Sequence, residues 1–500
     1  MKKVLVANRG EIAQSAIRCI REMGIETAAV CSQVEPDALH IRNADQVFIL
    51  PGGHISLNYN SQERMLECAL AAKADAIYCG YGFLSEVPEF AKACSDKGIT
   101  FIGPDAGHLE NLRNKPHCLE AAASLGIATP VHSATIANED DLVVKAADIG
   151  YPVFLKPHWG SGGRRIIKAY RREDLLESYR GLIREREIRN LNIPYYLEKS
   201  IRSAVHLEFP VLADQHGNVV HFGERECVVQ RRYQKIISET PSPRLKPETR
   251  LKMAEAALAI VRKLGFVGCG AVEFLLDPAG RWYFLEINPR IPVEYALTDL
   301  TCGVELIKEQ VRIAAGEKLR FKGNAVTPTG HAVECRVNAE DPERDFRPSA
   351  GVISEYYLPG GYGYSVQSSV QNGMQVDIYF DPMILKLNCF ASTREEALSK
   401  LRFSMSGVRI KGIRTNLSFI RRVIHSKEFV ESTLTCDFKI EDYLSPRSKD
   451  KRRQEVAAIV TALEHELGMR AKTPGYRRMG GETSNWNLAG RLALLGRRDL

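Results

Sequence analysis

The chain has 500 residues, of which 44% are hydrophobic and 26% charged, a balance that excludes a largely disordered or fibrous protein, and its length predicts several domains. The net charge is +7, yet residues 445–500 hold 12 lysines or arginines against 6 aspartates or glutamates and so carry +6 of it. The other residues balance at 56 against 55, which excludes a uniformly basic, nucleic-acid-binding surface.

The sequence also argues against membrane and secreted classes of protein. It has no run of about 18 apolar residues that could span a bilayer, and the apolar stretch at residues 4–7 is too short for a signal-peptide core. The twelve cysteines are scattered without a C-x-x-C pair, which favours a reduced interior over a disulfide framework or a zinc site. We therefore expect a cytoplasmic protein with no nucleic-acid or membrane partner.

The first 114 residues predict a doubly wound α/β domain. Strands are expected at residues 4–7, 27–31 and 74–78, and a helix with apolar positions from Ile12 to Met23 follows the first of them. Strands that alternate with helices favour a parallel sheet. The loop after the first strand lacks G-x-G-x-x-G, so the dinucleotide fingerprint is absent. Its helix start is either an anion site or a plain structural turn.

A second unit is expected over residues 115–330. One of its strands ends on Lys156, and a glycine-rich turn follows at residues 160–163. A lysine beside glycine backbone suits phosphate oxygens, although such turns more often just connect strands. No G-x-x-x-x-G-K-[ST] is present, so the turn is not a P-loop.

Two later strands of this unit carry a stronger signal. Glu273 lies in one, and the next ends with Glu286 and Asn288, which face the same side because they are two residues apart. Two carboxylates and an amide are suitable hard oxygen ligands for Mg²⁺ on nucleotide phosphates. The alternative is a pair of surface strands with solvated glutamates. Arg290 and Glu294 crowd the following turn, which favours a site.

The C-terminal third divides at about residue 446. Residues 331–446 have many short strand-like runs, and alternation places Glu334 and Arg336 on one strand face, where the arginine could hold a carboxylate or a phosphate. Residues 447–500 read as a basic linker followed by a helical extension. Because the excess charge lies there, we interpret this tail as a partner-docking element.

Seven segments together resemble the biotin carboxylase family, a branch of the ATP-grasp superfamily. They are ANRGEIA at 7–13, DALH at 37–40, GYGFLSE at 80–86, GERE at 223–226, QRRYQK at 230–235, EINPRIPVEY at 286–295 and ECRVNAEDP at 334–342. The resemblance covers residues 1 to about 444. It implies an α/β fold with an N-terminal (pre-ATP-grasp) domain at 1–114, an ATP-grasp domain at 115–330 with a mobile lid at about 131–203, and an α+β C-terminal domain at 331–446.

This resemblance implies ATP-driven carboxylation of biotin. Bicarbonate attacks the γ-phosphate of MgATP to give carboxyphosphate, and its CO₂ is captured by the ureido nitrogen of biotin. The implied cofactors are ATP and Mg²⁺, with Mn²⁺ as an alternative metal. The implied partners are a biotin carboxyl carrier protein, a carboxyltransferase subunit and a second copy of the chain. The sequence has no Ala-Met-Lys-Met attachment site, so the biotin is expected on another chain.

The resemblance also implies a role for individual residues. The ATP site would comprise Lys115, Lys156, Gly162, Gly163, Glu198, Lys199, His206 and Gln230, and the Mg²⁺ ligands would be Glu273, Glu286 and Asn288. The catalytic set would be Lys235 and Arg290 on bicarbonate, Glu294 as general base and Arg336 on the biotin enolate, with Tyr81 beside the biotin ring.

Several positions depart from the family pattern. Pro292 stands where a bicarbonate-contacting glutamine is expected, and proline supplies neither a side-chain amide nor a backbone N–H. The other departures are Tyr295 and Tyr233 for histidines, Val205 for an arginine, Pro210 for a glutamine, Tyr78-Cys79 for His-Pro, and Trp159 and Arg165 in the glycine loop.

Three interpretations of these departures stay open. The first is an active carboxylase with an altered pocket, which the retained charged residues favour. The second is a catalytically impaired subunit with a scaffolding or regulatory role. The third, an ATP-grasp ligase with another acceptor, is less favoured because Tyr81 and Arg336 of the biotin pocket are both present.

Overall fold

The computed structural model describes residues 1–52, 57–160, 163, 165–188, 193–444, 459 and 462. The chain divides into two compact units, Met1–Leu444 and Ser445–Leu500. The predicted helical extension at 447–500, apart from two positions, and the predicted ATP-binding Gly162 lie outside the described residues. Among the helices described, none combines the length and apolar character that crossing a bilayer requires.

The N-terminal part is the parallel α/β sheet that the sequence predicts. Its strands lie in the order β3-β2-β1-β4-β5, and every neighbouring pair is parallel. The buried face of α1 carries Ile12, Ala16, Ile17 and Ile20, the apolar spacing of a helix that packs on a sheet. The bounds are β1 Lys3–Val6, α1 Gly10–Glu22, β2 Glu26–Ser32, β3 Gln46–Leu50, α2 Gln62–Ala72, β4 Ala76–Tyr78, α3 Pro88–Asp96, β5 Thr100–Ile102 and α4 Ala106–Arg113.

A small separate body follows, within the segment that the sequence assigns to a lid. It consists of a three-stranded sheet in the order β7-β6-β8, accompanied by α6 and α7. Its buried residues, among them Leu142, Leu155 and Leu175, form a core of their own. The bounds are α5 Lys115–Ser124, which precedes it, α6 Glu139–Ile149, β6 Val153–Pro157, β7 Ile167–Ala169, α7 Arg172–Ile188 and β8 Tyr195–Lys199.

A nine-stranded sheet forms the centre of the unit. Its order is β14-β13-β9-β11-β12-β15-β22-β20, with β10 added beside β9, and its neighbouring strands are antiparallel. The bounds are β9 Val205–Ala213, β10 Val219–His221, β11 Arg225–Arg231, β12 Gln234–Thr240, β13 Gly268–Leu276, β14 Trp282–Asn288, β15 His331–Asn338, β20 Tyr364–Ser368 and β22 Met383–Ala391.

This sheet runs continuously across residue 330. Strand β12 pairs with β15, with Ile237 opposite Cys335, so one sheet carries strands from the central and the C-terminal parts. The helices after β12 are α8 Pro247–Lys263, α9 Tyr295–Cys302, α10 Leu306–Ala314, α11 Arg394–Gly407, α12 Leu417–His425 and α13 Lys427–Val430. The short strands are β16 Glu340–Asp341, β17 Arg347–Pro348, β18 Gly351–Val352, β19 Glu355–Tyr357, β21 Gln375–Val376 and β23 Arg409–Lys411.

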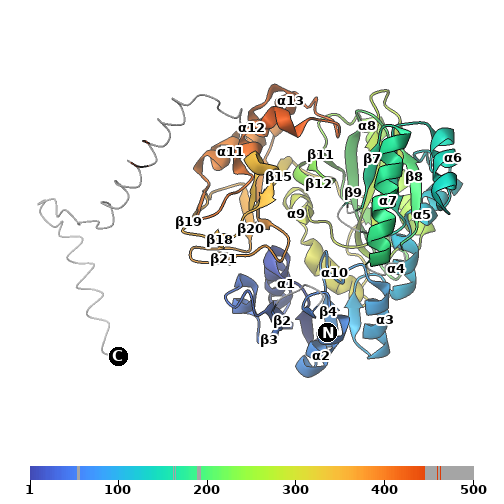
Figure 1. Ribbon diagram of the computed structural model, residues 1–500. Helices are drawn as coiled ribbons and strands as arrows, with labels where there is room; N and C mark the ends of the chain where they lie inside the picture. The colour runs from blue at the N-terminus through green and yellow to red at the C-terminus, as the bar shows by residue number, and fades with distance from the viewer. Residues whose placement is uncertain are drawn as a thin grey trace, which may run out of the picture. The chain divides into compact units, whose positions relative to one another are not determined.

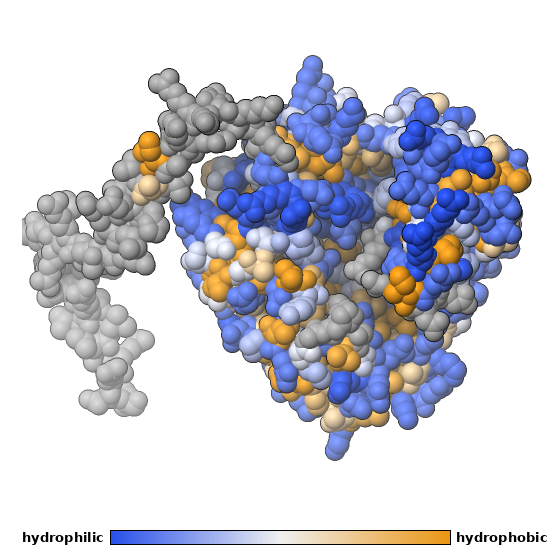
Figure 2. Space-filling view, viewed as in Figure 1, coloured by the Kyte–Doolittle hydropathy of each residue, from blue (hydrophilic) through white to orange (hydrophobic). Residues whose placement is uncertain are grey.

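The arrangement places the large sheet between the other parts of the unit. In Figure 1, β9, β11 and β12 lie between the lid elements α6, α7 and β8 on one side and the C-terminal helices α11–α13 on the other. The space-filling view in Figure 2 is hollowed between these two sides, with hydrophilic residues around the hollow. Side chains from strands before and after residue 330 can therefore meet on the large sheet.

Candidate active site

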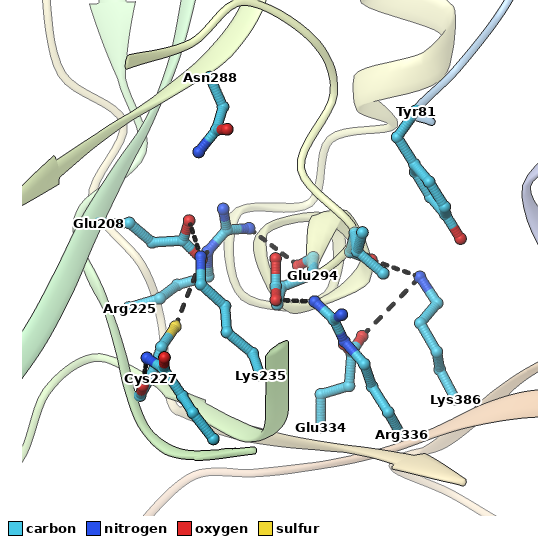
Figure 3. Close-up of polar contacts among 12 residues, drawn as sticks. Tyr81, Glu208, Arg225, Cys227, Lys235, Asn288, Glu294, Glu334, Arg336 and Lys386 are labelled. Atoms are coloured by element: carbon cyan, nitrogen blue, oxygen red, sulfur yellow. Dashed lines mark hydrogen bonds and ion pairs between the residues drawn. The ribbon is translucent and has the colours of Figure 1, made fainter. Parts of the chain in front are cut away.

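Lys235 on β12 joins two buried carboxylates of neighbouring strands. Its Nζ lies 2.7 Å from Glu208 Oε2 on β9 and 2.9 Å from Glu273 Oε1 on β13. Burial alone would lower the pKa of Lys235, but Glu208 and Glu273 raise it well above its usual value. The lysine therefore remains a cation, and Figure 3 shows it directed at the centre of the site.

Glu273 is the second centre of this network. His206 Nε2 contacts its Oε2 at 2.8 Å, and Asn288 Nδ2 donates to its Oε1 at 2.8 Å. Gln230 Nε2 donates to His206 Nδ1 at 2.7 Å, which leaves Nε2 as the ring nitrogen that donates to the carboxylate. Burial would raise the pKa of Glu273, but Lys235 and His206 hold it well below the usual value. Glu273 is therefore ionised.

The three predicted metal ligands form a donor set that fits a divalent cation. Glu273 and Glu286 stand directly opposite each other on β13 and β14, and Asn288 follows on the same face as Glu286. Lys115 Nζ holds Glu286 Oε2 at 2.6 Å. Within the described ranges no cluster of three or more His, Cys, Asp or Glu side chains is arranged for a metal. Two carboxylates and an amide alone do not complete a metal's coordination, so Mg²⁺ bound there would take its other oxygens from water or phosphate.

Glu294 lies just before α9, enclosed by cations. Its carboxylate accepts a hydrogen bond from Arg336 Nη2, and its backbone carbonyl accepts one from Arg225 Nη1 at 2.8 Å. Burial would raise the pKa of Glu294, but Arg336, Lys235 and Arg225 hold it well below its usual value. Figure 3 shows this carboxylate between Arg336 and Arg225, so it is ionised and, while Arg336 holds it, only a weak base.

Arg290 extends from the turn after β14 toward the N-terminal part. Its Nε donates to Glu86 Oε1 at 2.8 Å, and its Nη2 donates to Asn288 Oδ1 at 3.4 Å. Burial would lower the pKa of Arg290, but Glu86 and Glu294 raise it. A permanently charged guanidinium thus links the predicted metal ligands with the first domain, where it can hold an anion.

The predicted ATP-binding residues of the lid separate into two groups. Lys156 Nζ and Glu198 Oε1 form an ion pair at 2.5 Å, with the Glu198 side chain 1% exposed. Lys199 turns the other way, because adjacent residues of a strand face opposite sides, and donates to the carbonyls of Gly150 at 2.6 Å and Tyr151 at 3.1 Å. The structure therefore brings Lys156 and Glu198 together and leaves Lys199 outside that pair.

The substituted residues of the glycine loop have contacts of their own. The Arg113 guanidinium lies 5.5 Å from the Trp159 ring centre, and Arg165 Nη2 lies 2.9 Å from Glu185 Oε1. Tyr233 packs edge-to-face on Phe154 of the lid at 5.8 Å between ring centres. The Trp159 contact and the Tyr233 contact join the lid segment to other parts of the unit, whereas the Arg165–Glu185 pair lies within the lid segment.

Figure 3 shows the Tyr81 hydroxyl on the side of Lys386 that faces away from the Glu294–Arg336 pair. The Tyr81 hydroxyl donates to Glu11 Oε1, and the Tyr295 hydroxyl donates to Glu11 Oε2 at 3.1 Å. Tyr295 begins α9, where its N–H donates to the carbonyl of Pro292 at 3.2 Å. The two substituted residues of this turn thus contact each other through the backbone.

Sequence reasoning gave no role in the site to several residues of this network. Glu86 and Arg225 lie inside the segments that carry the resemblance, and those segments were the signal that could have pointed to them. Glu208 follows His206 by two residues on β9, so strand alternation could have placed it on the same face. Lys386 on β22 stands in a strand that gave no motif.

The fold and site define an ATP-grasp enzyme: a large antiparallel sheet bearing carboxylates and lysines, a small separate lid sheet and a parallel N-terminal domain. Three family models match in succession: "Biotin carboxylase, N-terminal domain" at residues 1–109, "Carbamoyl-phosphate synthase L chain, ATP binding domain" at 115–322, and "Biotin carboxylase C-terminal domain" at 334–441. The chain belongs to the biotin carboxylase family.

Relatives of known name match nearly the whole chain. The 2-oxoglutarate carboxylase small subunit of Hydrogenobacter thermophilus is 37% identical over 467 residues, covering 92% of this chain and 99% of its own length. Biotin carboxylase 1 of Bacillus subtilis is 39% identical over 445 residues, covering 89% and 99%. The crystal structure of the Hydrogenobacter biotin carboxylase domain dimer with MgADP, ADP and bicarbonate is 38% identical, has a TM-score of 0.85, and covers 88% of this chain and 97% of that one.

Proposed function

We propose that this chain is the biotin carboxylase subunit of a multisubunit carboxylase and carboxylates biotin on a separate carrier protein, using ATP and bicarbonate. The observation that carries the proposal is Glu294, an ionised carboxylate held between Arg336 and Arg225 beside the cation of Lys235. The Hydrogenobacter relative, solved with MgADP and bicarbonate, supports the same chemistry.

The proposal gives each site residue a role. In the proposal ATP is bound by Lys115, Lys156, Gly162, Gly163, Glu198, His206 and Gln230, with Lys199 near the adenine, and Mg²⁺ by Glu273, Glu286 and Asn288. Mg²⁺, or Mn²⁺ in its place, would draw charge from the phosphate oxygens that it binds. The division at residues 1–114, 115–330, with a lid at about 131–203, and 331–446 belongs to the same proposal.

The reaction begins with bicarbonate held by the Lys235 and Arg290 cations. Glu294 accepts the bicarbonate proton while a bicarbonate oxygen bonds to the γ-phosphorus and the bond to the ADP oxygen breaks. The carbon–oxygen bond of the resulting carboxyphosphate then breaks to give CO₂ and phosphate; the phosphate takes the ureido N–H proton of biotin, and the ureido nitrogen bonds to CO₂. Arg336 stabilises the negative oxygen of the biotin enolate, and Tyr81 lies beside the ring.

The ion pair between Glu294 and Arg336 suggests when Glu294 becomes basic enough to deprotonate bicarbonate. A carboxylate held by a guanidinium is a weak base, because the ion pair lowers its pKa. When Arg336 turns to biotin, Glu294 loses that partner and its basicity rises. Binding of biotin would thereby favour deprotonation of bicarbonate.

The partners belong to the proposal as well. The relatives include proteins named as subunits of carboxylases, and one solved relative is named a dimer. We infer a biotin carboxyl carrier protein, a carboxyltransferase subunit and a second copy of this chain as partners. All twelve cysteines are free, which supports a reducing compartment such as the cytoplasm.

Phosphate release from ATP by the intact chain tests the proposal. We expect release to depend on bicarbonate and to rise further with free biotin. An ATP-grasp ligase with another acceptor would show no rise with biotin. A chain that binds ATP but shows no stimulation by bicarbonate or biotin would contradict the proposal and leave a scaffolding or regulatory subunit.

Pro292 separates the active enzyme from the impaired subunit. In an active enzyme, Pro292→Gln adds one side-chain contact to bicarbonate, so we expect kcat/KM for bicarbonate to rise at most about fivefold, the value of one hydrogen bond. If the wild-type chain shows no bicarbonate-dependent phosphate release and the Pro292→Gln variant does, the result would support the impaired subunit instead.

A further inference from the structure

A buried carboxylate lies behind the tyrosine of the proposed biotin pocket. Glu11, in the first turn of α1, is 4% exposed. One of its oxygens accepts from the Tyr81 hydroxyl and lies 3.1 Å from Lys386 Nζ, and the other accepts from the Tyr295 hydroxyl at 3.1 Å. Three polar groups thus bind one carboxylate.

These groups come from parts of the chain that are distant in sequence. Glu11 lies on α1, Tyr81 follows β4, Tyr295 begins α9 and Lys386 lies on β22. Lys386 is fully buried, and its ammonium lies 3.9 Å from the Tyr295 ring centre. A buried ammonium requires a countercharge, which Glu11 supplies.

Tyr81 is held at both ends by this arrangement. Asn8 Nδ2 donates to the backbone carbonyl of Tyr81 at 2.8 Å, while Glu11 holds the hydroxyl. Burial, and then the negative charge of Glu11, raise the pKa of Tyr81 well above the usual value, so the hydroxyl stays a donor. The ring therefore has little rotational freedom before any ligand arrives.

We infer that Glu11 and Tyr295 are positioning residues that fix Tyr81 for biotin: Glu11 anchors the Tyr81 hydroxyl, and Tyr295 holds the second oxygen of Glu11. The inference rests on the proposed function. A fixed ring favours binding because less conformational entropy is lost when the ligand arrives. Tyr295 stands where the family pattern has a histidine, and its hydroxyl keeps its proton near neutral pH, where a histidine would titrate.

Tyr295→Phe tests the inference with the smallest change, since it keeps the ring on Lys386 and removes only the hydroxyl. We expect the KM for free biotin to rise about fivefold, the effect of losing one hydrogen bond, while kcat and the KM for ATP change by less than about twofold. A variant that was merely less stable would not move the biotin KM alone.

Two further variants sharpen the test. Glu11→Gln keeps the shape and removes the charge, and should raise the biotin KM more than Tyr295→Phe; thermal unfolding checks that it folds. Tyr356→Phe is the matched control, because it removes a hydroxyl that donates to Ser368 Oγ at 2.7 Å and touches none of the four groups. Its biotin KM should equal that of the wild type.

The outcomes distinguish this inference from the proposed function. A wild-type chain without biotin-stimulated phosphate release overturns the proposed function, and the inference with it. A stimulated wild type whose Tyr295→Phe variant keeps the wild-type KM for biotin overturns the inference alone. A rise in the biotin KM that Tyr356→Phe reproduces also overturns it.

Discussion

Glu294 is the residue on which the charges of the site converge. Arg336 binds its carboxylate, Arg225 binds its backbone carbonyl, and both cations, with Lys235, lower its pKa against the effect of burial. Because the residue is 1% exposed, water contributes little to its charge state. Its protonation is therefore governed by the neighbouring cations.

Glu294→Gln should abolish turnover and spare nucleotide binding. The amide has nearly the shape of the carboxylate but cannot accept a proton, so bicarbonate-dependent phosphate release should fall about 10²- to 10⁴-fold. The measurement pairs phosphate release with ATP titration by calorimetry. Glu355→Gln is the control, because it removes a carboxylate from a surface pair with Lys411 at 2.7 Å and should change neither. Preserved turnover in Glu294→Gln would remove the base assignment.

The raised pKa of Asp299 predicts how the free energy of unfolding depends on pH. Burial raises its pKa from 3.8 to about 8, although the Leu306 N–H donates to it. The folded chain holds this proton up to about pH 8 and the unfolded chain releases it near pH 3.8, so stability falls as pH rises between those values. The slope for one proton is about 1.4 kcal/mol per pH unit.

Asp299→Asn should remove this contribution, because an amide does not titrate and still accepts from Leu306. Urea unfolding at pH 5 and pH 8 measures this change in the free energy of unfolding. The wild type should be less stable at pH 8 than at pH 5, and the Asp299→Asn variant should show a smaller difference. Equal losses in the two proteins would show that Asp299 is ionised in the folded chain across this range.

The lid sheet contacts the β11–β12 turn of the large sheet and the segment that follows α13. Tyr233, at φ 64° in the β11–β12 turn, packs on Phe154, and Lys168 Nζ lies 2.7 Å from Asp437 Oδ1. Gly163 lies against the same turn at φ +69°, and an added Cβ would come within 2.7 Å of Tyr233 Cβ and 2.8 Å of Arg232 O. Only glycine fits this approach.

Gly163→Ala should separate the lid from the β11–β12 turn and raise the KM for ATP. Backbone strain of about 1–3 kcal/mol, expressed in full in nucleotide binding, corresponds to roughly 5- to 150-fold in KM. Gly217→Ala is the matched control: it has φ +85° but nothing within 4 Å, so it should cost stability without changing the ATP KM. Equal effects of the two variants on KM would contradict a role for the lid contact.

At the scale of the whole molecule, the first compact unit ends at Leu444, and the segment that carries most of the net positive charge begins at the next residue. Leu444 and Tyr443 pack against the main hydrophobic core, and the compact unit ends there. Residues 445–500 carry +6 of the net charge, whereas residues 1–444 are nearly neutral. A basic segment outside a neutral catalytic unit suits attachment to an acidic partner.

Truncation after Leu444 should therefore leave turnover with free biotin unchanged and abolish co-purification of the carrier or carboxyltransferase chain. The cut keeps Tyr443, which packs on Phe419 at 6.5 Å between ring centres. Added salt should weaken the full-length complex in the same way. Intact assembly by the truncated chain would refute the docking role of the tail.

The sequence by itself determined the α/β fold and the family, because strand alternation and seven ordered segments are local properties of the chain. It also supplied the residue types of the site, among them Lys235, Glu273 and Glu294. Only the tertiary structure decided how they pair: Lys235 with Glu208 as well as Glu273, Lys199 with backbone carbonyls, and Tyr295 with Glu11. A buried charge takes its partner from whatever the fold brings within reach, and residues hundreds of positions apart meet only after the strands have assembled.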